Sequence, residues 1–257
     1  MRTQRPKAQQ LRQQRQQEVV LYGENACRAA LMNRFDQVIK AFFTDETAPR
    51  FGDAMKALAA TRKAYKVVTD DELVRISQSQ HHGGVALVVR KPSAISLHDY
   101  LLDTHRKRDC IIALENVSNP HNLGAIMRSA AHFGVKAILL PEPDLLFSGS
   151  AVRTAEGGAE IITPIAAHPN FIEGLGRLRK AGYSLLSTTS HRGKSLYSTK
   201  LPEKLVIIFG EEQLGISKSV NNLSDLAIKI PGTGAVESLN VSVATALILG
   251  EWWRQGH

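Results

Sequence analysis

Polar groups that are costly to bury gather near the end of the chain, between two apolar segments. Residues 226–230 form an apolar run typical of a buried strand, and residues 241–252 are almost wholly apolar or small, which predicts a buried helix. Between them, residues 231–234 (PGTG) can present backbone N–H and C=O groups without bulky side chains, and Ser238 and Asn240 follow. Because buried polar groups need hydrogen-bond partners, this arrangement predicts a binding site.

Arg128 is the second candidate for chemistry. It lies outside the core-facing stripe of the predicted helix that follows Asn119 and Pro120, on a side where Gly124 and Ala125 leave room for a close neighbour. An arginine in such a place is most often a solvated surface residue. A guanidinium can also hold a phosphate through two N–H donors. Because a guanidinium stays protonated in proteins, a role as general base is disfavoured, and we expect positioning and charge stabilisation.

A third candidate follows another apolar run, residues 205–209. Gly210 would let a ligand approach the backbone at the carboxyl end of this strand, where parallel sheets bind ligands. Glu212 could orient a residue of the site. Two adjacent acids, Glu211 and Glu212, are also common at a solvated loop end.

The elements that would position these residues alternate between strand and helix from Cys110 onward. Strands are expected at residues 110–114, 137–140, 161–165, 183–187, 205–209 and 226–230, and helices at 122–133, 148–155, 170–181 and 241–254. Short apolar strands separated by amphipathic helices predict an α/β fold with a parallel sheet covered on both faces.

A smaller α/β pattern precedes it. Strands are expected at residues 19–23, 38–44, 65–68 and 85–89, and helices at 25–33, 52–61 and 73–77, the last capped by Asp70 or Asp71. His81 and His82 lack a ligand partner at metal-binding spacing and are interpreted as a turn. Residues 92–108 resemble a linker with one short helix at 97–102, and the Gln-rich, basic residues 1–17 a disordered tail.

The charge of the chain is segregated. The net charge is +8; residues 1–108 hold 19 Lys/Arg and 11 Asp/Glu, whereas residues 109–257 hold 13 of each. A basic part joined to a neutral part favours a nucleic-acid partner for the first. The only two cysteines, Cys27 and Cys110, lie far apart, which argues against a disulfide framework and favours the cytoplasm. Neither a signal peptide nor a membrane span is expected.

Three segments together resemble the motifs of the SpoU (TrmH-like) branch of the SPOUT methyltransferases, which methylate RNA at the ribose 2′-hydroxyl. They are Glu115 to Gly134 (ENVSNPHNLGAIMRSAAHFG), Val206 to Ser217 (VIIFGEEQLGIS) and Ile228 to Trp253 (IKIPGTGAVESLNVSVATALILGEWW). The phrases YGENAC at residues 22–27 and HHGGVA at residues 81–86 resemble the family's L30e-like substrate-binding domain.

The resemblance implies a domain organisation. It consists of a basic disordered tail (1–17), an L30e-like RNA substrate-binding domain (18–91), a linker (92–108) and a SPOUT methyltransferase domain (109–257) with a C-terminal trefoil knot. The substrate implied is structured RNA, either rRNA or tRNA. Family members are homodimers that complete the pocket across the interface, and no metal or membrane is implied.

The resemblance also assigns residues. The catalytic set would be Arg128, Asn122, Glu212, Ser238 and Asn240. S-adenosylmethionine would be held mainly by main-chain groups at Gly210, Ile230 and Leu239, with Thr188 as a weaker candidate.

Some positions depart from the family pattern, and two other functions stay open. Asn119 replaces a common Asp, Gln213 replaces a Gly-rich turn residue, and Glu156 stands where a small or thiol-bearing residue is usual. The chain could therefore be a non-catalytic RNA-binding relative that keeps the fold. A nicotinamide-dependent oxidoreductase, suggested by residues 232–234 (GTG), is disfavoured because Glu237 stands in place of the third glycine.

Overall fold

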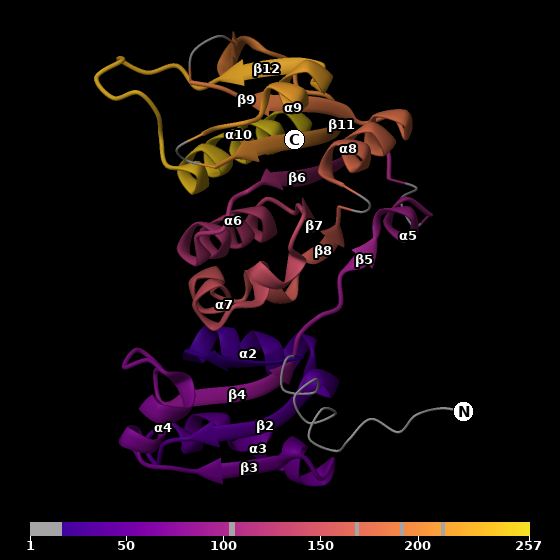
Figure 1. Cartoon of the computed structure of the whole chain (residues 1–257). Helices are drawn as coiled ribbons and strands as arrows, with labels where there is room; N and C mark the ends of the chain where they lie inside the picture. Colours follow the sequence, from indigo (N-terminus) through magenta and orange to yellow (C-terminus); the bar gives the residue numbers. More distant parts are fainter. Residues whose placement is uncertain (1–16, 103–105, 168–169, 191–192, 212–213) are drawn as a thin grey trace.

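The computed structural model describes residues 17–102, 106–167, 170–190, 193–211 and 214–257. They form two sheets with their helices, and the smaller, N-terminal unit lies below the larger one in Figure 1. Of the predicted basic tail, residues 1–16 lie outside the described residues.

The smaller sheet has the order β1 (Glu18–Tyr22), β4 (Val85–Arg90), β2 (Val38–Phe43) and β3 (Ala64–Val67). Its first two pairings are antiparallel, and β2 pairs with β3 in parallel. Apolar residues of α2 (Glu24–Asn33) and α3 (Gly52–Ala60) pack on one face, and those of α4 (Asp70–Ser77) on the other. These elements follow the predicted ranges closely.

The predicted cap of α4 was wrong by one or two residues. Thr69 is the N-cap, because its Oγ1 accepts a hydrogen bond from the Glu72 N–H at 3.3 Å, and the Glu72 carboxylate accepts one from the Thr69 N–H at 3.0 Å. This reciprocal capping box leaves Asp70 and Asp71 in the first turn, where their negative charges favour the helix dipole.

The larger sheet is entirely parallel. Its order is β10 (Lys194–Ser195), β12 (Leu226–Lys229), β9 (Ser184–Thr188), β11 (Lys204–Gly210), β6 (Asp109–Glu115), β7 (Ala137–Leu140), β8 (Thr163–Ala166) and β5 (Ile95–Ser96). One face packs on α6 (Pro120–His132), α7 (Gly149–Ala155) and α10 (Val241–Gly256). The other packs on α5 (Leu97–Leu102), α8 (Phe171–Lys180) and α9 (Lys218–Leu223). The predicted parallel sheet covered on both faces is confirmed.

The segment interpreted as a linker does more than connect. Its predicted helix is confirmed as α5, but residues 95–96 also form β5 and pair with β8 at the edge of the large sheet. A two-residue strand carries too little apolar pattern to be recognised from sequence. The two-residue strand β10 and the six-residue helix α9 were also missed.

The two units share one hydrophobic cluster, which continues from β1 and α2 into α6 and α7. Arg34, directly after α2, donates from Nη2 to the carbonyls of Ala159 at 3.0 Å and Ile162 at 3.3 Å. At Gly149, the first residue of α7, a Cβ would lie 2.9 Å from the Val20 carbonyl oxygen. The N-terminal unit is therefore docked on α7 by close packing and by polar contacts.

The last helix differs from its prediction. Val241, Ile248, Leu249 and Trp252 are buried, but Val243, Leu247 and Trp253 remain 47%, 38% and 44% exposed. Alpha10 therefore buries one side and presents an apolar side to the outside of the chain. No helix in the described residues is long and apolar enough to cross a membrane. The trefoil knot stays a prediction, because strand order alone does not define how the chain is threaded.

Candidate active site

Three of the four predicted cofactor residues, Thr188, Gly210 and Ile230, lie along one edge of the large sheet. Because β12, β9 and β11 are adjacent and parallel, their carboxyl ends meet there. Thr188 ends β9 and pairs in register with Ile228 of β12. Its hydroxyl donates to the Ile208 carbonyl of β11 at 3.0 Å, which ties the strands together at the edge. Ile230 follows β12 directly and is partly buried.

Gly210 ends β11 at this edge, opposite Glu115 of β6. A Cβ at Gly210 would lie 2.1 Å from the carbonyl oxygen of Gly215, because the chain turns back after Glu211 and Gly215 N–H donates to the Glu211 carbonyl at 2.8 Å. The glycine is therefore required by its own loop, a reason that differs from the predicted approach of a ligand. Glu212 and Gln213 lie outside the described residues.

Glu115 fixes the far end of the same loop. One of its carboxylate oxygens accepts a hydrogen bond from the Ser217 N–H at 2.8 Å, and Ser217 caps α9 through its own hydroxyl. Glu115 begins the first of the three motifs, but no role was predicted for it. Its position at the end of a buried strand, next to a strand that carries a second motif, is the signal that could have identified it.

The starts of α6 and α10 are joined by side chains. Asn119 caps α6 as predicted, since its Oδ1 accepts from the N–H groups of His121 at 2.9 Å and Asn122 at 3.3 Å. Asn240 caps α10 by accepting from the Ser242 N–H at 2.9 Å, and its Nδ2 donates to Asn122 Oδ1 at 3.0 Å. The structure thus brings together two predicted site residues that are 118 positions apart in the sequence.

Arg128 is exposed on α6, and within the described residues its side chain has no hydrogen bond or ion pair. The small residues on this side of α6 leave room for other parts of the protein itself. A Cβ at Gly124 would lie 2.5 Å from the Ala151 carbonyl oxygen, and one at Gly158 would lie 3.0 Å from Arg128 Cα. Helix α6 is therefore held tightly while the Arg128 guanidinium stays available for a ligand.

Ser238 and Leu239 lie in the segment that joins β12 to α10, visible as the long loop that leaves the sheet in Figure 1. Every residue from 231 to 240 is exposed. Leu239, one of the residues whose main chain is predicted to bind the cofactor, is therefore accessible, whereas Gly210 and Ile230 are partly buried. The exposed segment fits a ligand held mainly by backbone contacts. Asn240 is the N-cap of α10, whereas Ser238 is not a cap.

Glu156, one of the unusual positions, is not in the predicted pocket loops. It ends α7 in the left-handed region with φ 50°, and its carboxylate accepts a hydrogen bond from Asn25 Nδ2 of α2 at 2.6 Å. It therefore connects the two units. Of the two histidines suspected to form a turn, His82 is buried and its Nδ1 accepts from the Gly84 N–H at 3.1 Å. No cluster of three metal-binding side chains occurs among the residues described.

The arrangement can bind and position rather than transfer protons. It combines an accessible guanidinium, a pair of linked amides and exposed backbone groups beside the carboxyl ends of parallel strands. Such a constellation suits recognition of a phosphate, a ribose and a cofactor at one edge of the sheet.

Known proteins resemble this chain over most of its length. The sequence profile of the SpoU rRNA Methylase family matches residues 109–250, and that of the RNA 2′-O ribose methyltransferase substrate binding domain matches residues 20–94. An uncharacterized tRNA/rRNA methyltransferase, YfiF, of Escherichia coli O157:H7 is 46% identical over 95% of this chain and 70% of its own length. The 23S rRNA (guanosine-2′-O-)-methyltransferase RlmB of Pseudomonas aeruginosa is 33% identical over 91% of this chain and 96% of its own.

Solved structures show the same fold. A crystal structure of an RNA 2′-O ribose methyltransferase aligns with a TM-score of 0.78 and 25% identity, over 94% of this chain and 90% of that one. An rRNA methyltransferase from Sinorhizobium meliloti with bound AdoMet aligns with a TM-score of 0.77 and 21% identity, over 95% of this chain and 90% of that one.

Proposed function

The chain belongs to the SpoU rRNA methylase family, and we propose that it transfers the methyl group of S-adenosylmethionine to a ribose 2′-hydroxyl of rRNA or tRNA. The observation that carries the proposal is the accessible Arg128 on a helix whose start is joined to α10 by the Asn122–Asn240 hydrogen bond. Family membership removes the nicotinamide-dependent alternative.

Arg128 would grip a phosphate beside the target ribose. With N–H donors and a fixed positive charge, it orients the 2′-hydroxyl and stabilises charge as the oxygen attacks, without exchanging a proton. The Asn122–Asn240 pair holds the starts of α6 and α10 in register, so that Arg128 and the exposed loop meet the same ligand. Ser238, in that loop, would contact the ribose, and Glu212 would orient a neighbouring group.

S-adenosylmethionine supplies the methyl group when bound. Thr188, Gly210, Ile230 and Leu239 are the residues we propose for its site. Gly210 and Glu115 act there by fixing the loop after β11, since each holds one end of it. A preformed loop loses less conformational entropy when the cofactor binds.

We further propose a homodimer that joins through α10. Its exposed apolar residues are Val243, Leu247 and Trp253. Val243 and Leu247 are four positions apart and so share one side of the helix, in the half that follows the exposed residues 231–240. A large apolar side on a helix is favourable when a second copy covers it. A partner packed there would also approach the site.

The domains and the location of the protein are also assigned. We propose residues 18–91 as the RNA substrate-binding domain, residues 92–108 as the connection and residues 109–257 as the methyltransferase domain. Both cysteines are free and buried, which supports a cytoplasmic location.

Two experiments test the proposal. Ribose methylation mapped across rRNA and tRNA of a deletion strain is expected to lose one 2′-O-methyl site, which returns with the wild-type gene but not with an Arg128→Ala gene. Titration calorimetry with S-adenosylmethionine distinguishes an active enzyme from a non-catalytic RNA-binding relative. A folded protein that binds RNA but no cofactor would support the second interpretation.

A further inference from the structure

A hollow of ≈ 430 Å³ lies on the N-terminal unit, away from the loops of the cofactor site. It is bordered by the second half of α2 and by the chain from Pro49 into α3. Three of its lining side chains are cationic, namely Arg28, Arg50 and Lys56, and one is acidic, Asp53. We propose that this hollow, here called the α2–α3 groove, is a second RNA-binding site, which holds backbone phosphates of the substrate RNA at a distance from the methylated ribose.

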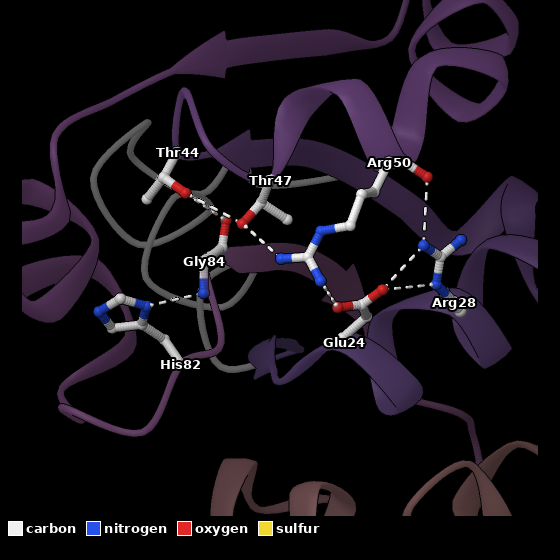
Figure 2. A network of polar contacts seen from close by, with 7 residues as sticks. All are labelled: Glu24, Arg28, Thr44, Thr47, Arg50, His82 and Gly84. Atoms are coloured by element: carbon white, nitrogen blue, oxygen red, sulfur yellow. Dashed lines mark hydrogen bonds and ion pairs between the residues drawn. The ribbon is translucent and has the colours of Figure 1, made fainter.

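The two arginines are held in place before any ligand binds. Figure 2 shows both guanidinium groups on the carboxylate of Glu24, which accepts from Arg28 Nη2 at 2.8 Å and from Arg50 Nη1 at 2.7 Å. Arg28 Nη2 also donates to the Arg50 carbonyl at 3.1 Å, and Arg50 Nη2 donates to Thr47 Oγ1 at 3.3 Å. Side chains fixed in this way lose little rotamer freedom when they bind a phosphate.

The ion pairs with Glu24 leave both guanidinium groups able to bind a ligand. The side chains of Arg28 and Arg50 remain 43% and 49% exposed, whereas that of Glu24 is 27% exposed. Arg28 Nη1 and Arg50 Nε have no partner within the described residues. With Lys56 against Asp53, the groove and Glu24 together carry three positive charges and two negative ones, so an anion is favoured.

An aromatic floor supports one of these cations. Arg28 Cζ lies 4.3 Å from the ring centroid of Phe51, which is buried and contacts Phe43 at a centroid distance of 5.3 Å. A guanidinium held over a ring keeps its position, and its free N–H groups can donate to the oxygens of a phosphate. Arginine planes are also surfaces on which RNA bases stack.

The groove and the catalytic helix are connected by one short turn. A Cβ at Gly157 would lie 3.1 Å from Ala29 Cβ of α2, and one at Gly158 would lie 3.0 Å from Arg128 Cα of α6. The Asn25–Glu156 hydrogen bond fixes the same corner. One RNA could therefore contact Arg128 and the α2–α3 groove together, with a spacing set by the docking of the two units.

RNA affinity measured against salt tests the groove. The Arg28→Ala/Arg50→Ala variant and the wild type are titrated with protein-free ribosomal RNA as the probe. Because each lost phosphate contact removes a released counterion, we expect the slope of log affinity on log salt to become shallower by about one to two units. We also expect affinity to fall at least about tenfold, with KM for RNA raised, kcat at saturating RNA retained and S-adenosylmethionine affinity unchanged. An unchanged slope and affinity would overturn the proposal.

A cross-linking experiment covers the case in which the double variant does not fold. Met32 is 83% exposed at the groove, and the native cysteines are buried, so Met32→Cys places one accessible thiol there. Labelled with a photoactivated aryl azide, it is expected to cross-link ribosomal RNA more strongly than the matched Leu102→Cys variant, whose site is 64% exposed on α5. Equal cross-linking would contradict the groove. The inference rests on the proposed function, but this readout needs no methyl transfer, so the two can fail separately.

Discussion

At the scale of single residues, the proposed methyl transfer depends most on Arg128. It is exposed, and no side chain in the described part of the chain neutralises it. We expect Arg128→Ala to lower kcat for methyl transfer by about a hundredfold or more, because a positioned charge near the reacting oxygen is lost. S-adenosylmethionine affinity, measured by calorimetry, should stay within about twofold. Lys180→Ala, exposed at the end of α8, is the control and should keep full activity. Wild-type rates in Arg128→Ala would show that the assignment is wrong.

Glu160 is the residue for which a pH-dependent contribution to the free energy of unfolding is clearest. Burial raises its pKa from 4.5 to about 7, although Arg34 opposes the shift, and within the described residues its Oε2 has no hydrogen-bond partner. The folded protein thus holds a proton that the unfolded chain releases near pH 4.5. Its stabilising contribution is complete below that pH and is lost as the pH rises through about 7.

Glu160→Gln should remove this dependence. The free energy of unfolding of the wild type, measured by urea denaturation, should fall relative to that of the variant by on the order of 2 kcal/mol between pH 5 and pH 8. Glu46→Gln, at an exposed position, should follow the wild type at both pH values. Parallel curves for wild type and Glu160→Gln would contradict the explanation.

At the scale of elements, the loop after β11 is the sharpest test. Gly210→Ala places a Cβ 2.1 Å from the Gly215 carbonyl oxygen, so the loop must move. We expect S-adenosylmethionine affinity to fall at least about tenfold, as measured by calorimetry. Gly176→Ala is the matched control: a Cβ there meets nothing within 4 Å, and the change in helix α8 should stabilise the protein by about 0.5–1 kcal/mol. Unchanged affinity in Gly210→Ala would exclude this loop from the cofactor site.

The elements also show what the sequence could and could not predict. Regular apolar spacing located the main strands and helices, and the polar residues after them marked the edge of the sheet. Two-residue strands such as β5 carry no such pattern. The Asn122–Asn240 bond joins residues 118 positions apart, so only the resemblance placed them in one site. The exposed side of α10 was missed because an apolar helix looks alike from sequence whether protein core or a second copy covers it.

At the scale of the whole molecule, the apolar side of α10 predicts an oligomer. Leu247→Glu places a charge on this side and should convert a dimer to a monomer in light scattering after size-exclusion chromatography. We expect methyl transfer to fall with it, since the proposed interface lies beside the exposed loop. Ile172→Glu, 44% exposed on α8, is the control and should remain dimeric and active. A Leu247→Glu variant that stays dimeric would place the interface elsewhere.

The activity proposed for the full chain is methyl transfer to ribose. The most direct measurement incubates the full chain with isotope-labelled S-adenosylmethionine and rRNA or tRNA from a deletion strain, then digests the RNA to nucleosides for mass spectrometry. We expect label in a single 2′-O-methylated nucleoside, absent with Arg128→Ala. Label on a base, or none with both cofactor and RNA bound, would contradict it.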